Sequence, residues 1–271
     1  MLKISDTITI VRRRNPLQLM EAVVDQLEQG LLDSLEHQAS RPLGLATGRT
    51  MEPLYAALVS RLRAWPTDRL HLLRQRWRSF NLDEYVGLAP EHPSSFSAFM
   101  GYHLVRPLGL NAAQVMLPDG AAAHPEAAAD RFAAEILSAG GIGSQLLGLG
   151  SNGHVGFNEP PCGPDVRCRV VKLSPATRSQ NASAFQGSPG LVPEQAITLG
   201  LQEILAAKEL HLIVTGAPKA GILRKALELD GDPEVPASWL RRHPKLWLWG
   251  DDAAWGEEGP GTDDDPMAIL D

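Results

Sequence analysis

Three short stretches of the sequence carry polar side chains of kinds that bind anions or move protons. The first, residues 43–50, reads Leu-Gly-Leu-Ala-Thr-Gly-Arg-Thr, an apolar run that ends in a turn. If a helix begins there, its free backbone N–H groups, the hydroxyls of Thr47 and Thr50, the small Gly48 and the guanidinium of Arg49 form an anion site, most naturally for a phosphate. The alternative is that Thr50 merely caps the helix.

The second stretch places two adjacent carboxylates at the end of another apolar run. Residues 80–85 read Phe-Asn-Leu-Asp-Glu-Tyr, so an aromatic residue lies on each side of Asp83 and Glu84. Aromatic neighbours limit the access of water, and a partly desolvated carboxylate is a suitable base for removing a proton from carbon. The alternative is that both acids are solvated turn residues.

The third stretch, residues 148–160, reads Gly-Leu-Gly-Ser-Asn-Gly-His-Val-Gly-Phe-Asn-Glu-Pro. It contains the spacing G-x-G-x-x-G, but a dinucleotide site also needs a following helix and an acidic residue about 20 positions on. Neither is present, because the helix positions are interrupted by prolines at 160, 161 and 164. What remains is a glycine-rich turn that presents His154 and Glu159, a pair suited to proton transfer.

The elements that position these stretches alternate between short apolar runs and segments of helical period. The expected strands are 8–11, 43–46, 77–82, 114–117, 145–149, 169–173, 210–215 and 246–250. The expected helices are 16–38, 52–63, 94–105, 125–138, 202–207, 218–229 and 238–242. This pattern predicts a single-domain α/β fold over residues 1–255, an open, mainly parallel, Rossmann-like sheet with helices on both faces. An acidic tail with little order is expected over 256–271. In such sheets ligands bind at the carboxyl ends of the strands, where all three stretches lie.

Composition narrows the class of protein further. The chain has 271 residues, 44% of them hydrophobic and 21% charged, which are ordinary values for a globular protein. The net charge of −7 argues against a nucleic-acid partner. No apolar run is long enough to span a bilayer and the N-terminus lacks a signal pattern, so we expect no membrane partner and a cytoplasmic location. The two cysteines, Cys162 and Cys168, fit no metal or redox motif and are expected to be free thiols.

Several separated strings, taken in order, carry a resemblance to a known family. They are Phe-Asn-Leu-Asp-Glu-Tyr-Val-Gly-Leu at 80–88 with Glu-His-Pro at 91–93, Gly-His at 153–154, Phe-Asn-Glu-Pro at 157–160, Ala-Ile-Thr-Leu-Gly at 196–200, Val-Thr-Gly at 214–216 and Lys-Ala at 219–220. Together they resemble the glucosamine-6-phosphate deaminase (isomerase) family from about residue 43 to 254. The related 6-phosphogluconolactonases share the fold and the Gly-His turn, but the strings at 83–85 and 157–160 are the deaminase forms.

The resemblance implies a role for each polar residue. Asp83 would move a proton between C2 and C1 of the sugar, His154 with Glu159 and Asn152 would open the sugar ring, and Lys219 would contact the phosphate. Further substrate contacts are expected from Glu84 and Gly150, and from the phosphate loop with Thr47, Gly48, Arg49 and Thr50. The resemblance implies no metal and no cofactor.

Two positions depart from the family's pattern. Asn152 stands where the best-known members have Asp, and an amide can orient the imidazole of His154 but cannot stabilise imidazolium by charge. Ser183 stands where the family has a phosphate-binding Arg. Arg49 lies in the phosphate loop where the family usually has a small residue, and we expect its guanidinium to replace the missing one. The alternative is that Arg49 points into solvent or pairs with Glu52.

Three functions from different classes remain open at this point. The leading one is deamination of an amino-hexose 6-phosphate to fructose 6-phosphate and ammonia. The alternatives are a hydrolase of the 6-phosphogluconolactonase type and a non-catalytic sugar-phosphate sensor. The expected partner is a small amino-sugar phosphate, and the chain is expected to be a monomer or a homo-oligomer.

Overall fold

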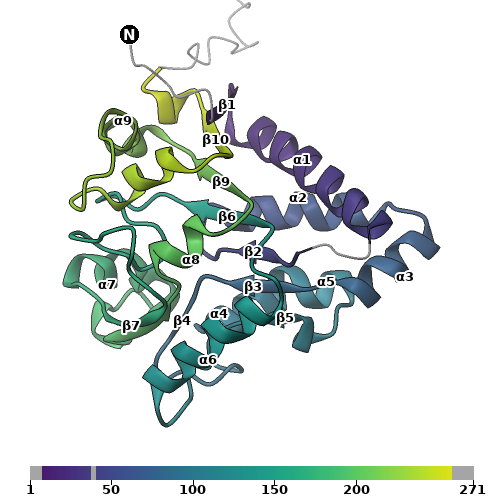
Figure 1. Cartoon of the computed structure of the whole chain (residues 1–271), viewed down its shortest axis with the longest axis horizontal. Helices are drawn as coiled ribbons and strands as arrows, with labels where there is room; N and C mark the ends of the chain where they lie inside the picture. The colour runs from purple at the N-terminus through teal and green to yellow at the C-terminus, as the bar shows by residue number, and fades with distance from the viewer. Residues whose placement is uncertain (1–7, 38–40, 258–271) are drawn as a thin grey trace, which may run out of the picture.

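A seven-stranded, all-parallel sheet forms the centre of the computed structural model, which describes residues 8–37 and 41–257 (Figure 1). Its strands, in spatial order, are β1 (Ile8–Arg13), β10 (Leu246–Asp251), β9 (Glu209–Val214), β6 (Ser144–Gly148), β2 (Leu43–Leu45), β3 (Ser79–Asn81) and β5 (Val115–Met116). A second, antiparallel sheet contains β4 (Asp83–Tyr85), β8 (Gln195–Thr198) and β7 (Arg169–Lys172). The predicted open α/β fold is therefore confirmed.

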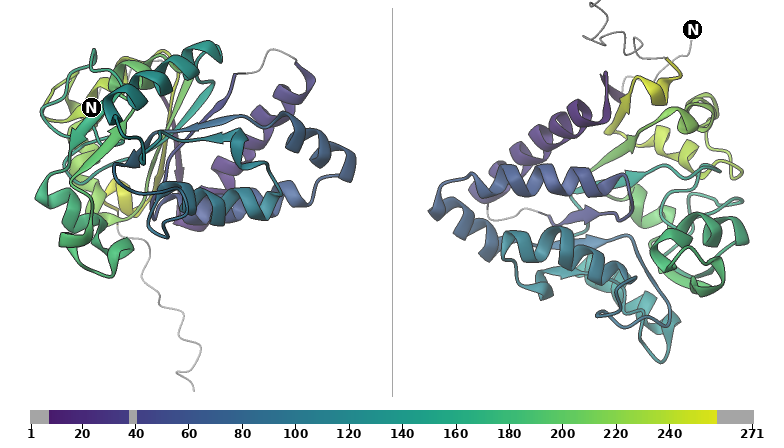
Figure 2. Two further views of the ribbon diagram at one scale, coloured as in Figure 1. Left: turned by 90° about the horizontal axis from the view of Figure 1, so that it is seen from below. Right: turned by 180° about the vertical axis from the view of Figure 1, so that it is seen from behind.

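Helices cover both faces of the main sheet, as Figure 2 shows. One face carries α1 (Pro16–Glu36), α2 (Met51–Arg63), α3 (Thr67–Arg76), α4 (Phe96–Met100) and α5 (Arg106–Leu108), with a π-helical segment, Gly101–Val105, between the last two. The other carries α6 (Pro125–Ser138), α8 (Leu201–Leu205) and α9 (Ala220–Glu228), while α7 (Pro175–Asn181) lies beside the small sheet. None of the helices within 8–37 and 41–257 is long and apolar enough to cross a membrane.

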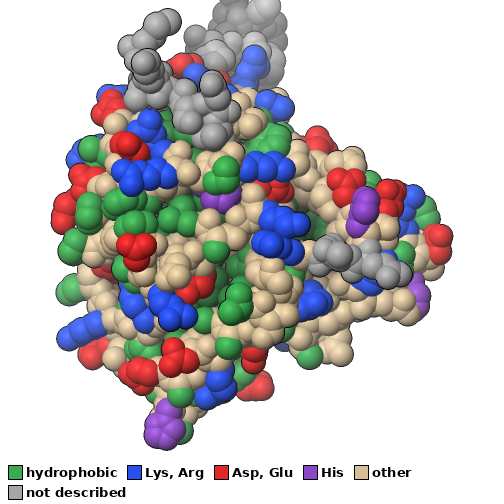
Figure 3. Space-filling model, viewed as in Figure 1, with side chains coloured by type: hydrophobic (Ala, Val, Ile, Leu, Met, Phe, Trp, Pro, Cys, Tyr) green, Lys and Arg blue, Asp and Glu red, His purple; other side chains and the backbone are tan. Residues whose placement is uncertain are grey.

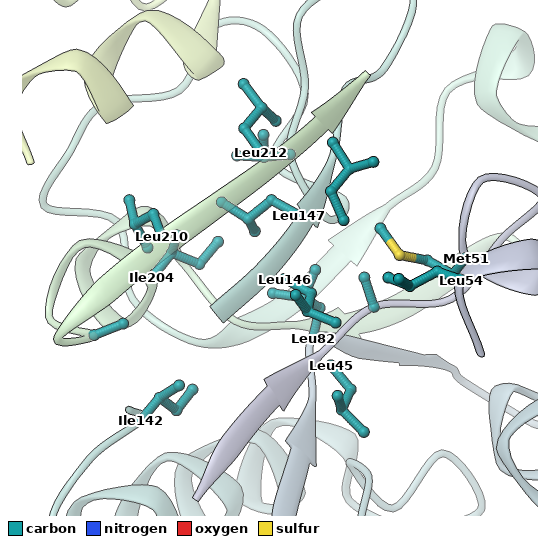
Figure 4. Packing of buried hydrophobic residues seen from close by; sticks show 14 of the residues in the cluster. Leu45, Met51, Leu54, Leu82, Ile142, Leu146, Leu147, Ile204, Leu210 and Leu212 are labelled. Atoms are coloured by element: carbon teal, nitrogen blue, oxygen red, sulfur yellow. The ribbon is translucent and has the colours of Figure 1, made fainter. Parts of the chain in front are cut away.

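Local sequence explains why these helices begin where they do. The Asn15 side chain accepts a hydrogen bond from the backbone N–H of Gln18 (2.9 Å) at the start of α1, and Pro16 occupies the first turn. The apolar residues of α1 recur every three or four positions and are buried against the sheet. In Figure 4, Met51 and Leu54 of α2 reach toward Leu45, Leu82 and Leu146, so the start of α2 is anchored in the core.

Six elements differ from the sequence prediction. The expected strand 77–82 ends at Asn81, and the chain then leaves the main sheet so that β4 joins the small one. The expected strand 169–173 also belongs to the small sheet. β8, α3 and α7 were not predicted; α3 lacks an apolar stripe and buries only Leu73. The expected helix 238–242 is a 3₁₀ segment, Pro236–Arg242. The acidic tail lies, from residue 258 on, outside the described residues.

The order of the strands creates a crevice at one place. β2 and β6 are neighbours, with Gly44 beside Gln145. The chain leaving β2 continues into α2 on one face, whereas the elements after β6 lead to α8 on the other face. Two loops that diverge from adjacent parallel strands leave an opening at the carboxyl ends of those strands. The first and third polar stretches follow β2 and β6 and therefore meet at this opening.

Candidate active site

The turn between β2 and α2 forms one wall of the site. Gly48 has a φ of +106°, a conformation that favours glycine, and its carbonyl accepts a hydrogen bond from the N–H of Met51 (2.9 Å) as the helix begins. Thr50 occupies the cap position but its side chain makes no capping hydrogen bond. The alternative that Thr50 serves only as a cap is therefore wrong, and its hydroxyl, like that of the half-buried Thr47, is available at the turn.

Two cations converge on this turn from different strands. Lys219, in the 3₁₀ turn Ala217–Lys219 after β9, donates from Nζ to the carbonyl of Leu149 (2.7 Å). Burial lowers the pKa of Lys219, and the positive charge of Arg49 lowers it further, so the two side chains lie near each other. Arg49 is exposed and makes no hydrogen bond or ion pair with any described residue. Among the described residues Arg49 forms no ion pair with Glu52, which was the alternative that the sequence left open. Both cations can therefore face one anion.

Asp83 is the buried carboxylate of the site. Its side chain is 6% exposed, it lies opposite Thr198 in the small sheet, and none of the hydrogen bonds within 8–37 and 41–257 involves its carboxylate. Burial, helped by the charge of Glu84, raises its pKa to about 8. The alternative of a solvated turn residue is therefore wrong for Asp83. A carboxylate held without donors in a place with little water is a strong base once ionised.

Glu84 has a different environment from its neighbour. Its Oε1 accepts hydrogen bonds from the N–H groups of Tyr85 (2.9 Å) and Phe96 (3.0 Å), and its Oε2 accepts one from Ser97 (2.8 Å). The side chain is 2% exposed, and burial raises its pKa against these stabilising contacts. Glu84 thus ties β4 to the start of α4. These contacts supply a structural role, and the expected contact with substrate stays a prediction.

His154 is held by Asn152 in one orientation. Asn152 Oδ1 accepts hydrogen bonds from the backbone N–H of His154 (3.2 Å) and from its Nδ1 (2.6 Å). Because a backbone nitrogen can only donate, the amide oxygen must face the ring, and Nδ1 carries the proton. Burial lowers the pKa of His154. A neutral imidazole with a free lone pair on Nε2 is the result, and it is the form that acts as a base.

Gly150 lies directly beneath the imidazole. A Cβ at this position would collide with the Cε1, Cδ2 and Cγ atoms of His154. The N–H of Gly150 also donates to the carbonyl of His154 (2.9 Å), which closes the turn. Any side chain at residue 150 would displace the ring, so the structure gives Gly150 a part in positioning His154. Its expected contact with substrate stays a prediction.

Glu159 completes the group around His154. Its negative charge raises the pKa of His154, while the charge of Lys219 lowers it, so both side chains lie close to the imidazole. Glu159 Oε1 accepts a weak hydrogen bond from the N–H of Ser174 (3.4 Å). The structure therefore brings together a neutral imidazole, a carboxylate and an ammonium group at the carboxyl ends of β6 and β9.

Three polar residues that the sequence reasoning did not single out order the turn before Glu159. Asn158 is fully buried and donates from Nδ2 to the carbonyls of Val155 (2.9 Å) and Leu199 (2.8 Å). Its Oδ1 accepts a hydrogen bond from Arg169 (2.9 Å), and Thr198 Oγ1 accepts one from the N–H of Phe157 (3.2 Å). Asn158 and Thr198 lie within the strings that carry the family resemblance, and that resemblance was the signal that could have identified them. Their contacts join the turn to the small sheet that carries Asp83.

The arrangement combines a cationic anion site with two proton-transfer groups. The cations and the helix start lie after β2 and β9, and the imidazole and the buried carboxylate lie after β6 and β3. A phosphorylated sugar anchored at one end would expose its other end to both bases. Among the residues that the structure describes, no group of three or more His, Cys, Asp or Glu side chains is arranged to hold a metal ion.

Comparison with known proteins shows the family to which the chain is similar. The model of the family of glucosamine-6-phosphate isomerases and 6-phosphogluconolactonase matches residues 14–249. A glucosamine-6-phosphate deaminase from Rhodopirellula baltica is 42% identical over 224 residues, covering 83% of this chain and 87% of the relative. A second, from Geobacillus sp., is 38% identical over 243 residues, covering 88% and 94% of the two chains.

Solved structures give the same result for the fold. The structure of a monomeric glucosamine-6-phosphate deaminase superposes with a TM-score of 0.82 at 32% identity, over 92% of this chain and 99% of the other. A 6-phosphogluconolactonase from Shewanella baltica superposes with a TM-score of 0.70 at 17% identity, over 92% and 99%, which is a likeness of fold alone. The chain therefore belongs to the glucosamine-6-phosphate isomerase/6-phosphogluconolactonase family.

Proposed function

We propose that the protein is a glucosamine-6-phosphate deaminase, which converts its substrate and water to fructose 6-phosphate and ammonia. The observation that carries this proposal is the buried Asp83, a carboxylate with no hydrogen-bond donor among the described residues and with a pKa raised to about 8. Isomerisation of a sugar requires a base for a proton on carbon, whereas hydrolysis of a lactone requires only an activated water. Two relatives named glucosamine-6-phosphate deaminases are 42% and 38% identical to this chain, which supports the same activity.

The first step is the opening of the sugar ring. His154 Nε2, free because Nδ1 is held by Asn152, takes the proton from the hydroxyl on C1 and returns it to the ring oxygen. The open form is an aldehyde with the amine on C2. During the transfer the imidazole is briefly a cation, and the negative charge of Glu159 stabilises it.

The second step is the transfer of a proton between two carbons. Asp83 removes the proton from C2 while the carbonyl oxygen on C1 takes a proton from the ammonium group on C2, which gives an enolamine; Asp83 then delivers its proton to C1. The product is an imine at C2. Water adds to this imine and ammonia leaves, which yields the ketone of fructose 6-phosphate. Burial of Asp83 keeps the proton on the carboxyl between its removal and its return.

Phosphate recognition rests on the turn after β2 and on Lys219. The N–H groups at the start of α2, Thr47, Gly48, Thr50 and two cations surround one dianion. Arg49 supplies the guanidinium that the family has at the position of Ser183, a residue that is exposed in the 3₁₀ turn Ala182–Phe185. A cytoplasmic location and a monomeric or homo-oligomeric state stay proposals from the sequence.

The test is an assay of two reactions with one preparation. With glucosamine 6-phosphate, we expect equal amounts of ammonia and fructose 6-phosphate; with 6-phosphogluconolactone, we expect no hydrolysis above the spontaneous rate. Hydrolysis of the lactone without release of ammonia would assign the protein to the lactonase branch. Neither reaction, with binding of the amino sugar intact, would make it a sensor.

A further inference from the structure

A cavity of about 1370 Å³ opens at the edge of the main sheet where the strands begin, opposite the active site. We call it the strand-start cavity. Its walls are α1 and α3 from one face of the sheet and α6 from the other, and its base is formed by residues at the starts of β2, β3, β6, β9 and β10. The proposed deaminase chemistry uses none of these residues, so the cavity has no role in that reaction.

Positive charge is concentrated around this cavity. Six cations line it against three acids, Asp33, Glu135 and Glu209, although the whole chain carries a net charge of −7. The six are Arg41, Arg76, Arg78, Arg131, Lys208 and Lys245. In Figure 3, Lys and Arg side chains gather beside the point where these strands begin. A local excess of one charge in a protein of the opposite charge attracts ions of the protein's own sign.

The side chains of most of these cations have no partner among the residues that the structure describes. Lys245 pairs with Glu209 (2.5 Å), and Arg76 donates to the carbonyl of Leu35 (2.8 Å). The side chains of the other four make no hydrogen bond and no ion pair with the residues in 8–37 and 41–257; they are Arg41, Arg78, Arg131 and Lys208. Charges left unpaired at the mouth of a cavity are available to a ligand.

Backbone hydrogen bonds set several of the cations in a row along the sheet edge. The carbonyl of Arg78 accepts the N–H of Leu43 (3.1 Å), and that of Lys245 accepts the N–H of Leu210 (3.0 Å). Lys208 itself donates to the carbonyl of Ile142 (3.1 Å). Arg78, Arg41, Lys208 and Lys245 thus precede β3, β2, β9 and β10, with the small Gly143 before β6 between them. Neighbouring strands lie about 4.8 Å apart, so the row suits several anionic groups in a chain.

The inner wall of the cavity is apolar. Leu27 and Leu31 of α1, Leu73 of α3 and Phe80 of β3 line it. Pockets for small organic ligands occupy about 300–1,000 Å³, so the space is far larger than a single phosphate requires. We propose that the strand-start cavity binds an organic polyphosphate of the nucleoside triphosphate class, with its phosphate chain along the row of cations and its apolar part against the leucines. This site does not depend on the proposed deaminase function.

The experiment measures binding of ATP to the full chain by calorimetry, without added divalent metal. We expect saturable binding, and we expect Arg78→Gln and Lys208→Gln each to weaken it by about tenfold or more. Arg63→Gln, an exposed arginine at the end of α2 that does not line the cavity, is the matched control and should bind as the wild type does. Thermal unfolding of each variant checks that it is folded, and its deaminase turnover should be unchanged.

The Arg49→Ala variant distinguishes ATP binding in this cavity from ATP binding in the active site, which also attracts phosphates. Loss of ATP binding in Arg49→Ala, with Arg78→Gln and Lys208→Gln unaffected, would overturn the proposal. Absence of ATP binding to the wild type would overturn it as well. Inorganic tripolyphosphate should bind more weakly than ATP, and equal affinity would contradict the part assigned to the apolar wall.

Discussion

The chemistry of Asp83 follows from its surroundings. The ionised form of a carboxyl needs water or donors, and this side chain has little of the first and no hydrogen bond with the described residues. Its pKa of about 8 is the consequence, and so is its strength as a base. His154 has the complementary environment, because Asn152 and burial keep it neutral with Nε2 free. Asp83 is therefore suited to proton transfer at carbon, and His154 to proton transfer at oxygen.

Asp83→Asn should change the stability of the free protein in a pH-dependent way, with a gain at high pH. Raising the pKa of this carboxyl from 3.8 to about 8 costs on the order of 5 kcal/mol when the group is ionised. The folded state holds the proton more tightly, so wild-type stability falls as the pH rises from about 4 to 8. The amide has no such dependence, but its own burial costs about 1–3 kcal/mol. We therefore expect a gain of about 3 kcal/mol at pH 8.5 and a loss of about 2 kcal/mol at pH 4, measured by urea unfolding. An equal difference at both pH values would contradict the assigned pKa.

The Asn152→Asp variant tests the position beside His154 at which this chain departs from the family's pattern. A carboxylate can accept the same two hydrogen bonds and adds a negative charge, which raises the pKa of His154 and stabilises the imidazolium formed on ring opening. We expect turnover to be unchanged or to rise by up to about tenfold. Asn152→Ala, which removes both acceptors, is the control and should lose turnover. A sharp fall in Asn152→Asp would show that the site is adapted to the amide and would contradict this account of ring opening.

At the level of elements, two turns that follow neighbouring strands together form the proposed substrate site. The turn after β2 offers helix N–H groups and Arg49, and the turn after β6 offers His154 over Gly150. Lys219 links them, because it donates to the carbonyl of Leu149 at the entry to the second turn while its charge meets that of Arg49. Changes at Lys219 should therefore affect both binding and turnover, whereas changes at Arg49 should affect mainly binding.

Arg49→Ala should raise KM for glucosamine 6-phosphate by about tenfold or more, with a smaller effect on kcat. The reason is that the phosphate is bound almost equally in the ground state and the transition state. Arg63→Ala, at the other end of α2, is the matched control. Adding Ser183→Arg to Arg49→Ala should recover much of the KM, since it restores a guanidinium at the family's position. An unchanged KM in Arg49→Ala, with a large rise in Lys219→Ala, would assign the phosphate to Lys219 and the backbone alone.

At the scale of the whole molecule, the order of the strands decides where the chemistry occurs. Loops leave the adjacent β2 and β6 toward opposite faces, and both carry site residues. Sequence patterning predicted most of this arrangement, because long helices such as α1 have a clear period and buried parallel strands are short apolar runs. The same patterning located all three polar stretches, since glycine-rich turns and paired acids are visible without a structure.

Other features depend on contacts that no local pattern contains. The run through residues 77–85 is continuous in sequence, yet the chain changes sheets after Asn81. Glu84 accepts hydrogen bonds from N–H groups 12 and 13 residues away, so its role depended on where α4 lies. β8 was not predicted, although it places Thr198 opposite Asp83. These are consequences of tertiary packing, and only the structure supplies them.

The central claim is that one buried carboxylate carries a proton from C2 to C1. The most direct test uses glucosamine 6-phosphate with deuterium at C2, in ordinary water, and measures deuterium at C1 of the fructose 6-phosphate formed. Because Asp83 is 6% exposed, we predict that a measurable share of the deuterium arrives at C1, and that Asp83→Asn lowers turnover by roughly two to four orders of magnitude. Hydrogen at C1 drawn only from solvent, together with wild-type turnover in Asp83→Asn, would contradict the account.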